Sequence, residues 1–158
     1  MKTIAEELKM RQFQNEFQKF YLNLLFTAHW MEHKNRQLLR PYGLTPAQYN
    51  VLRILRGQNG KGISATAIQE RMVFRNSNVT RIIEKLLEKG YVNKISCEGN
   101  RRRNDISLTS AGALALQEAE PVIRKLDGFL NQTVDLKSAI RLNALFDGIR
   151  NYEPLIHE

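Results

Sequence analysis

The sequence predicts a mainly α-helical fold with one small β-hairpin. Apolar residues recur three and four positions apart over most of the chain, which is the period of amphipathic helices. Three short helical segments between residues 45 and 90 precede two short strand-like segments. This order of elements is typical of a winged helix-turn-helix. We therefore expect such a core at residues 45–110, with an N-terminal helix in residues 1–44 and C-terminal helices in residues 111–158.

The first 44 residues predict one long helix that ends near Tyr42-Gly43, because glycine readily adopts the left-handed conformation after a helix. A second helix begins at Thr45-Pro46-Ala47-Gln48, which combines a capping box with proline at the first helical position. Ser64 can cap a short third helix. The stripe of the first helix consists of Phe13, Phe17, Phe20, Tyr21, Leu24, Leu25 and Ala28.

A fourth helix is expected from about Asn76 to Lys89, closed by Gly90, and two strands should follow at Tyr91–Ser96 and Asp105–Leu108. The intervening residues 97–103 would form a basic hairpin tip. Thr109 can cap a fifth helix, which Pro121 would kink or break, and a sixth helix should run from about Leu136 to Tyr152.

The charge distribution favours a polyanionic partner for the middle of the chain. Twenty-four basic and 16 acidic residues give a net charge of +8 and a pI near 9.8. Residues 45–110 hold twelve basic and five acidic residues. Nucleic acid attracts such a surface, although a solvated basic face without a partner is the simpler alternative.

Other function classes lack support in the sequence. A composition of 42% hydrophobic and 25% charged residues excludes a disordered or fibrous chain. The single Cys97 cannot form a disulfide framework, and no apolar run approaches the ~20 residues of a membrane span. We expect a soluble, cytoplasmic protein that is not an enzyme and has no cofactor and no membrane partner.

The expected fourth helix predicts a surface that reads DNA. Val79, Ile82, Ile83 and Leu86 share one face, so the opposite face is polar. An asparagine can bond adenine and an arginine can bond guanine, whereas hydroxyl and ammonium groups suit phosphates. The expected contacts from this helix are Asn76, Ser77, Asn78, Thr80, Arg81 and Lys85. Those from the hairpin, which can reach a narrow A·T minor groove, are Asn100, Arg101, Arg102 and Arg103.

Four consecutive blocks resemble the MarR family, the multiple antibiotic resistance regulators. The resemblance implies a bacterial transcriptional regulator, usually a repressor, that binds a pseudo-palindromic operator as a homodimer and is often released by a small aromatic ligand. It assigns the minor-groove contact to Arg102, with Asn100 where the family has aspartate. The blocks are GLTPAQYNVLRIL, ISATAIQERM, NSNVTRIIEKLLEKGYV and NRRRNDISLTSAG.

The outer helices would then form the dimer, since two recognition helices must lie about 34 to 36 Å apart on DNA. Packing within one chain is the alternative for the same apolar residues. The resemblance also indicates that an aromatic or anionic effector could bind near the end of the first helix, at Trp30, His33, Arg36 and Arg40. The expected dimer contacts are Phe13, Phe17, Phe20, Phe129, Leu145, Phe146, Ile149 and Tyr152.

Two alternatives to a regulator stay open at this point. An architectural or protein-interaction winged helix would keep the basic charge without reading sequence. The segment His29-Trp30-Met31-Glu32-His33 matches an inverted zincin pattern, H-x-x-E-H. A hydrolytic zinc site needs a third ligand, however, and the remaining histidine is His157. We therefore predict no metal site, with packed or solvated histidines in this segment. A regulatory metal or ligand site at His29, Glu32 and His33 stays open as the alternative.

Overall fold

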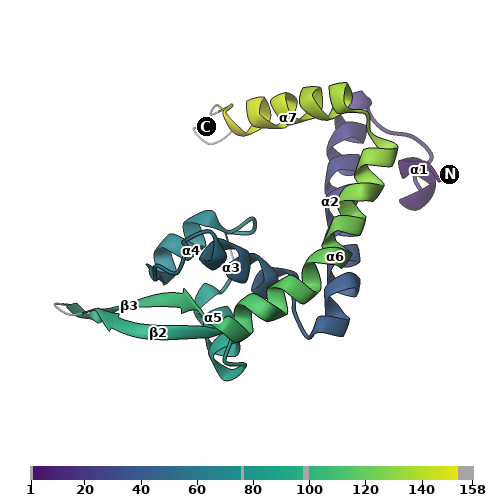
Figure 1. The fold of residues 1–158 in the computed structure, drawn as a ribbon. Helices are drawn as coiled ribbons and strands as arrows, with labels where there is room; N and C mark the ends of the chain where they lie inside the picture. Colours follow the sequence, from purple (N-terminus) through teal and green to yellow (C-terminus); the bar gives the residue numbers. More distant parts are fainter. Residues whose placement is uncertain (1, 76, 98–99, 153–158) are drawn as a thin grey trace. The chain divides into compact units, whose positions relative to one another are not determined.

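The computed structural model describes residues 2–75, 77–97 and 100–152, and the side chains of these residues except those of 95–104. The chain forms two compact units, residues 1–120 and 121–158. Figure 1 shows the helices and the hairpin formed by β2 and β3. The elements are α1 (Ile4–Glu7), α2 (Glu16–Leu39), η1 (Arg40–Tyr42), α3 (Pro46–Arg56), β1 (Ile63–Ser64), α4 (Ala65–Arg71), α5 (Val79–Glu88), β2 (Val92–Cys97), β3 (Asn100–Leu108), α6 (Ser110–Thr133) and α7 (Leu136–Arg150). The predicted mainly α-helical fold with a small hairpin is confirmed.

The core of the first unit joins the helix-turn-helix segment to the sheet. Aliphatic side chains from the end of α2, from α3, α4, α5, β2 and β3, and from the start of α6 are almost completely buried there. Their burial is the main source of stability for a domain of this size. The largest of these side chains are Leu39, Val51, Leu52, Leu55, Ile68, Leu86, Val92, Ile106 and Leu116.

The junction between the first long helix and the core has the predicted signals. α2 ends at Leu39, one turn of η1 follows, and Gly43 adopts a left-handed φ of 64°. Thr45 and Gln48 form both hydrogen bonds of the capping box, at 3.2 and 3.1 Å, and Pro46 opens α3. The Lys89 ammonium group donates to the Gly43 carbonyl and lies 3.4 Å from Gln48 Oε1, which links the end of α5 to this junction.

The fourth expected helix begins later than the sequence predicted. Ser64 caps α4 as expected, with its Oγ 3.2 Å from the amide of Ala67. α5 starts at Val79 instead of about Asn76, because the Asn78 side chain accepts a hydrogen bond from the Arg81 amide and therefore occupies the N-cap position. The predicted end is confirmed, since Gly90 follows Lys89 with a φ of 68°.

The hairpin is longer than predicted and lies in a three-stranded antiparallel sheet of order β1-β3-β2. Residues 100–103 were expected in the tip, but their backbone belongs to β3, and Cys97 belongs to β2. The pairing shifts register between Ser96 and Cys97. The two-residue strand β1 pairs Ile63 with Ile106 and was not predicted, because two residues cannot show an alternating pattern.

The two ends of the chain differ from the predictions in local detail. A kink or break at Pro121 was predicted, but α6 continues through this residue without a break. The boundary between the two compact units falls at the same residue. The Thr109 hydroxyl accepts from the Gly112 amide at 3.0 Å, as expected for a cap. The short helix α1 was missed, although Thr3 and Glu6 form a capping box that signals it. α7 begins after the N-cap Asp135 and ends at Arg150, close to its predicted bounds.

Candidate nucleic-acid interface

α5 separates apolar and polar side chains as its sequence predicted. Val79, Ile83 and Leu86 are buried, and Ile82 is half-buried. On the other side of the helix the side chains are exposed, and they include two cations. A helix with one face in the core and one free polar face can enter a major groove without losing core contacts. The exposed residues are Thr80, Arg81, Glu84 and Lys85.

The Asn78 side chain caps the N-terminal end of α5, a role that was not predicted. Asn78 Oδ1 accepts from the Arg81 amide at 3.1 Å, so the predicted adenine contact has to share this oxygen with the cap. The Asn78 amide nitrogen remains a donor for a base edge or a phosphate. Ser77 lies half-buried beside it, and Asn76 lies outside the described residues.

Lys85, a predicted phosphate contact, forms an ion pair on its own helix. Its Nζ lies 2.7 Å from Glu88 Oε2, and both side chains are more than half exposed. An exposed pair of this kind stabilises a protein by at most about 1 kcal/mol, so a phosphate can replace the carboxylate at small cost. The phosphate contact of Lys85 therefore stays a prediction.

Two side-chain amides hold the backbone of the turn between α4 and α5. Asn50 Oδ1, on α3, accepts from the Val73 amide at 3.1 Å. Gln69 Nε2, on α4, donates to the Arg75 carbonyl at 3.1 Å. Such bonds satisfy the backbone groups of a turn that lacks helical partners. The position of the N-terminus of α5 is thus set by both preceding helices.

The hairpin is anchored at its base and extends from the helices of the core, as Figure 1 shows for β2 and β3. β3 is the central strand, and Ile106 on it is only 2% exposed. The backbone of residues 100–103 continues the same strand, which makes these residues part of a sheet rather than a loop. The side chains of Asn100, Arg101, Arg102 and Arg103 lie outside the described ones, so their minor-groove contacts stay predictions.

The expected dimer residues present apolar surface within the chain. Phe13 and Phe146 are half-buried, and the other six are exposed. The dimer contacts of these residues stay predictions. The exposed members of the predicted set are Phe17, Phe20, Phe129, Leu145, Ile149 and Tyr152.

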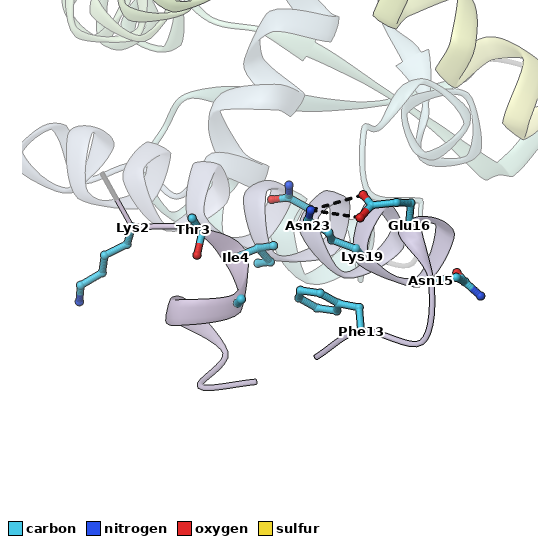
Figure 2. A pocket seen from close by; sticks show the side chains of 9 residues that line it. Lys2, Thr3, Ile4, Phe13, Asn15, Glu16, Lys19 and Asn23 are labelled. Carbon is cyan, nitrogen blue, oxygen red and sulfur yellow. Dashed lines mark hydrogen bonds and ion pairs between the residues drawn. The ribbon is translucent and has the colours of Figure 1, made fainter. Parts of the chain in front are cut away.

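Of the four predicted effector residues, Trp30 lines a hollow in the described part of the chain. Two hollows lie between the N-terminal segment and α2; the larger, about 720 Å³, includes Phe13 and a Lys19–Glu16 ion pair (Figure 2). Trp30 lines the smaller one, whereas the guanidinium of Arg36 lies 2.5 Å from Glu32 on its own helix. The lining residues of the two hollows do not include His33, Arg36 or Arg40.

The zincin-like segment does not form a zinc site among the described residues. His29 and His33 are exposed on α2, and Glu32 is engaged by Arg36. Within the described part of the chain, no three histidine, cysteine, aspartate or glutamate side chains lie close enough together to hold a metal ion. None of the described helices combines the length and apolarity that a membrane crossing requires.

Helices α3, α4 and α5 followed by an antiparallel hairpin define a winged helix-turn-helix, and the free polar face of α5 is the recognition surface of that class. Residues 44–103 match the model of the MarR family, as the resemblance in sequence indicated. This segment is therefore similar to the MarR family, and its own fold is that of a winged helix-turn-helix. The curated relatives it matches are named as HTH-type transcriptional regulators.

Relatives and solved structures agree with this assignment. The HTH-type transcriptional regulator PapX of Escherichia coli is 30% identical over 87 residues, which make up 55% of this chain and 53% of the relative. The chain thus spans about half the length of the curated relatives it matches. The structure of a MarR family transcriptional regulator from Silicibacter pomeroyi superposes with a TM-score of 0.70 at 25% sequence identity. The matched region makes up 86% of this chain and 94% of the Silicibacter chain.

The fold is also shared with structures solved on DNA. A mutant MarR from E. coli in complex with operator DNA has a TM-score of 0.75 at 19% identity, covering 87% of this chain and 98% of its own. The MepR–DNA complex of S. aureus has a TM-score of 0.74 at 18% identity, covering 86% and 96%. At these identities the likeness concerns the fold.

Sequence reasoning missed several residues around the turn before α5. Asn50 and Gln69 were not singled out, because their partners are backbone groups that only the fold brings near them. Val73 and Phe74 were also passed over, although both are large, apolar and exposed. An apolar pair that falls between two helices, outside either periodic stripe, was the available signal.

Proposed function

We propose that this protein is a sequence-specific DNA-binding transcriptional regulator. The observation that carries the proposal is the free polar face of α5, which presents Thr80, Arg81 and Lys85 from a helix whose N-terminus is fixed by α3 and α4. The MarR-family match over residues 44–103 and the relatives named as transcriptional regulators support it. Arg81 reads guanine in the major groove, and Arg102 enters the adjacent minor groove.

The proposal includes a homodimer on a pseudo-palindromic operator, acting as a repressor in the cytoplasm. Support for the dimer comes from the exposed apolar side chains of the outer helices, Phe129, Leu145 and Ile149 among them. A two-fold protein sets two recognition helices one DNA turn apart. Release by a small aromatic or anionic effector completes the proposed cycle, with Trp30, His33, Arg36 and Arg40 as candidate contacts.

The test is a selection from randomised duplexes of about 30 base pairs, long enough for two half-sites one turn apart, followed by footprinting of the selected sequence. A regulator yields a two-fold site. The protein should bind this site at least ~10³-fold more tightly than it binds bulk DNA at physiological salt. An architectural winged helix yields no preferred sequence. Protection of a single half-site contradicts the dimer.

The base-reading assignment has its own test. Arg81→Ala should weaken binding to the selected site by about 1–3 kcal/mol and relax the preference at one position of each half-site. Arg102→Ala should weaken binding with little change in major-groove preference. The exposed Arg11 provides a charge-matched control, since Arg11→Ala removes the same charge far from α5 in the sequence. Equal losses on selected and scrambled DNA for Arg81→Ala contradict the assignment.

A further inference from the structure

The turn before the recognition helix exposes two large apolar side chains. Val73 is 76% exposed and Phe74 is 56% exposed, whereas the preceding Met72 is buried. Among the described side chains of residues 46–94, these two are the exposed large hydrophobic ones. Leaving such side chains in water forgoes the stabilisation that burial would give. Their position therefore calls for a partner that covers them.

The exposure is a fixed feature of this turn. The Val73 amide donates to Asn50 Oδ1 at 3.1 Å, and the Arg75 carbonyl accepts from Gln69 Nε2 at the same distance. The Phe74 carbonyl also accepts from the Ser77 amide at 3.1 Å. With the backbone held on both sides, the Phe74 ring is directed outward by the fold itself.

The surroundings of Phe74 are cationic. Four basic residues and one acidic residue lie in the sequence from Arg71 to Lys85. The side chains of Arg71, Arg75 and Arg81 are exposed. An apolar protein partner would have to desolvate these charges, whereas DNA pairs them with phosphates. Charge complementarity thus selects nucleic acid as the occupant of this surface.

The major groove offers an apolar group that suits this ring. Thymine alone among the four bases presents a methyl group there, and phenylalanine is one of the side chains that contact it. Phe74 lies four residues before the N-cap Asn78, next to the end of α5 from which a recognition helix reads bases. A ring at this place can reach a base pair beyond the reach of Arg81.

We propose that Phe74 is a specificity-determining residue that contacts the C5-methyl group of a thymine in each half-site, with Val73 packed beside it. The proposal rests on the proposed DNA-binding function. It adds an apolar contact to the polar readout by Asn78 and Arg81. The expected consequence is a preference for thymine over uracil at one position.

The experiment is a thermodynamic cycle between protein and DNA. Wild-type protein and Phe74→Ala are titrated with the selected operator and with operators in which each thymine is replaced, one symmetric pair at a time, by deoxyuridine. Loss of one methyl contact should weaken wild-type binding by about fourfold per half-site, the factor equivalent to roughly 0.8 kcal/mol for a buried CH₂. Phe74→Ala should bind the thymine and uracil operators equally at that position. At every other position its preference between thymine and uracil should be the same as that of wild type.

Two further variants keep the result interpretable. Leu114, which is 55% exposed on α6, gives an apolar control, and Leu114→Ala should leave every thymine preference unchanged. Phe74→Leu keeps an apolar side chain and should retain part of the methyl discrimination. Thermal melting of each variant should match wild type, because the ring contributes little to the core.

The outcomes separate this proposal from the function on which it depends. If wild-type protein selects no operator, the proposed function fails and the methyl contact fails with it. If the operator is bound but Phe74→Ala leaves affinity unchanged, the function stands, the methyl contact is overturned, and the exposed pair is assigned to a protein partner instead. A loss of affinity spread evenly over thymine and uracil operators also overturns it.

Discussion

Asn50 on α3 and Val73 in the turn before α5 are joined by a hydrogen bond of 3.1 Å between the Asn50 carboxamide oxygen and the Val73 amide. The two residues are 23 positions apart in the chain. This bond fixes the turn to a helix that belongs to the core, since Val51 and Leu52, the next residues of α3, are fully buried. The recognition helix consequently takes its starting position from the core.

Removing the acceptor of that bond should loosen the turn. Asn50→Ala is expected to lower the free energy of unfolding by about 0.5–1.5 kcal/mol, the usual net worth of one such hydrogen bond. Asn50→Asp retains an acceptor oxygen and should lose less. The urea midpoints of the three proteins measure the difference. Identical losses in the two variants would show that the Val73 amide does not depend on Asn50.

Asn78 combines helix capping with a place on the proposed interface, and two substitutions can separate the roles. Asn78→Ala should cost about 1 kcal/mol of stability, because the N-cap acceptor is lost. Asn78→Asp keeps an oxygen that can cap the helix, and its negative charge interacts favourably with the positive end of the helix dipole. Stability should therefore be preserved.

The same aspartate would lie close to phosphates and should therefore weaken operator binding in a stably folded protein. Melting curves and DNA titrations on the same samples report the two effects. An Asn78→Asp protein that binds the operator as tightly as wild type would place residue 78 away from the DNA.

Gly112 marks the closest approach of α6 to the segment before β2. A Cβ added there would lie 2.1 Å from the Tyr91 carbonyl oxygen, which already accepts from the Thr109 amide at 3.1 Å. Backbone cannot move aside cheaply, so Gly112→Ala should destabilise the protein by about 1–3 kcal/mol.

Gly128 on the same helix is the matched control. A Cβ there meets no described atom within 4 Å, so Gly128→Ala should raise helix stability by up to about 1 kcal/mol. Chemical denaturation of both variants measures the contrast. Equal and small effects would argue against the close approach at Gly112.

Asp135 should give α7 a pH-dependent stability. The Ser138 hydroxyl at 2.5 Å and the Ser138 amide at 3.0 Å donate to its carboxylate, and these bonds hold the pKa of Asp135 below its ordinary value. A carboxyl whose pKa is lowered by folding stabilises the fold above its unfolded pKa, and this contribution is lost as the pH falls through the folded pKa.

Asp135→Asn keeps a capping oxygen that does not titrate. The difference in unfolding temperature between wild type and this variant should therefore be largest near neutral pH and disappear in acid. Helical circular dichroism followed through thermal unfolding measures it. A difference that stays constant with pH would contradict the role of the charged carboxylate.

Local chemistry made much of the fold predictable. The Thr45–Gln48 capping box, the left-handed Gly43 and the apolar positions of α5 each depend on a few neighbouring residues, and all three were confirmed. The predicted start of α5 was too early, because Asn78 and not an earlier residue is the N-cap. The turn that places Asn78 there is held by Asn50 on α3. Strand β1 was missed for a similar reason, since Ile63 becomes a strand residue only by pairing with Ile106.

The candidate interface divides in the same way. The polar side chains of α5 could be assigned from helical periodicity, because burial of one face leaves the other exposed. The exposure of Phe74 was not predicted, although its place between two helices was a signal, because phenylalanine side chains are most often buried. Its outward position results from two amides, Asn50 and Gln69, that hold the flanking backbone.

By itself, the sequence determined the class of fold, the order of the helices from α2 to α7 and the cationic face of α5, since helix caps, period and charge are set within a few residues. Tertiary structure alone decided where α5 begins, that residues 100–103 belong to a strand, and that Phe74 lies exposed beside the recognition helix. The turn that carries Phe74 and precedes α5 is held in part by the bond from the Val73 amide to Asn50, 23 positions away in the chain. Such a bond forms only after the core has brought α3 beside the turn, so local sequence does not reveal it.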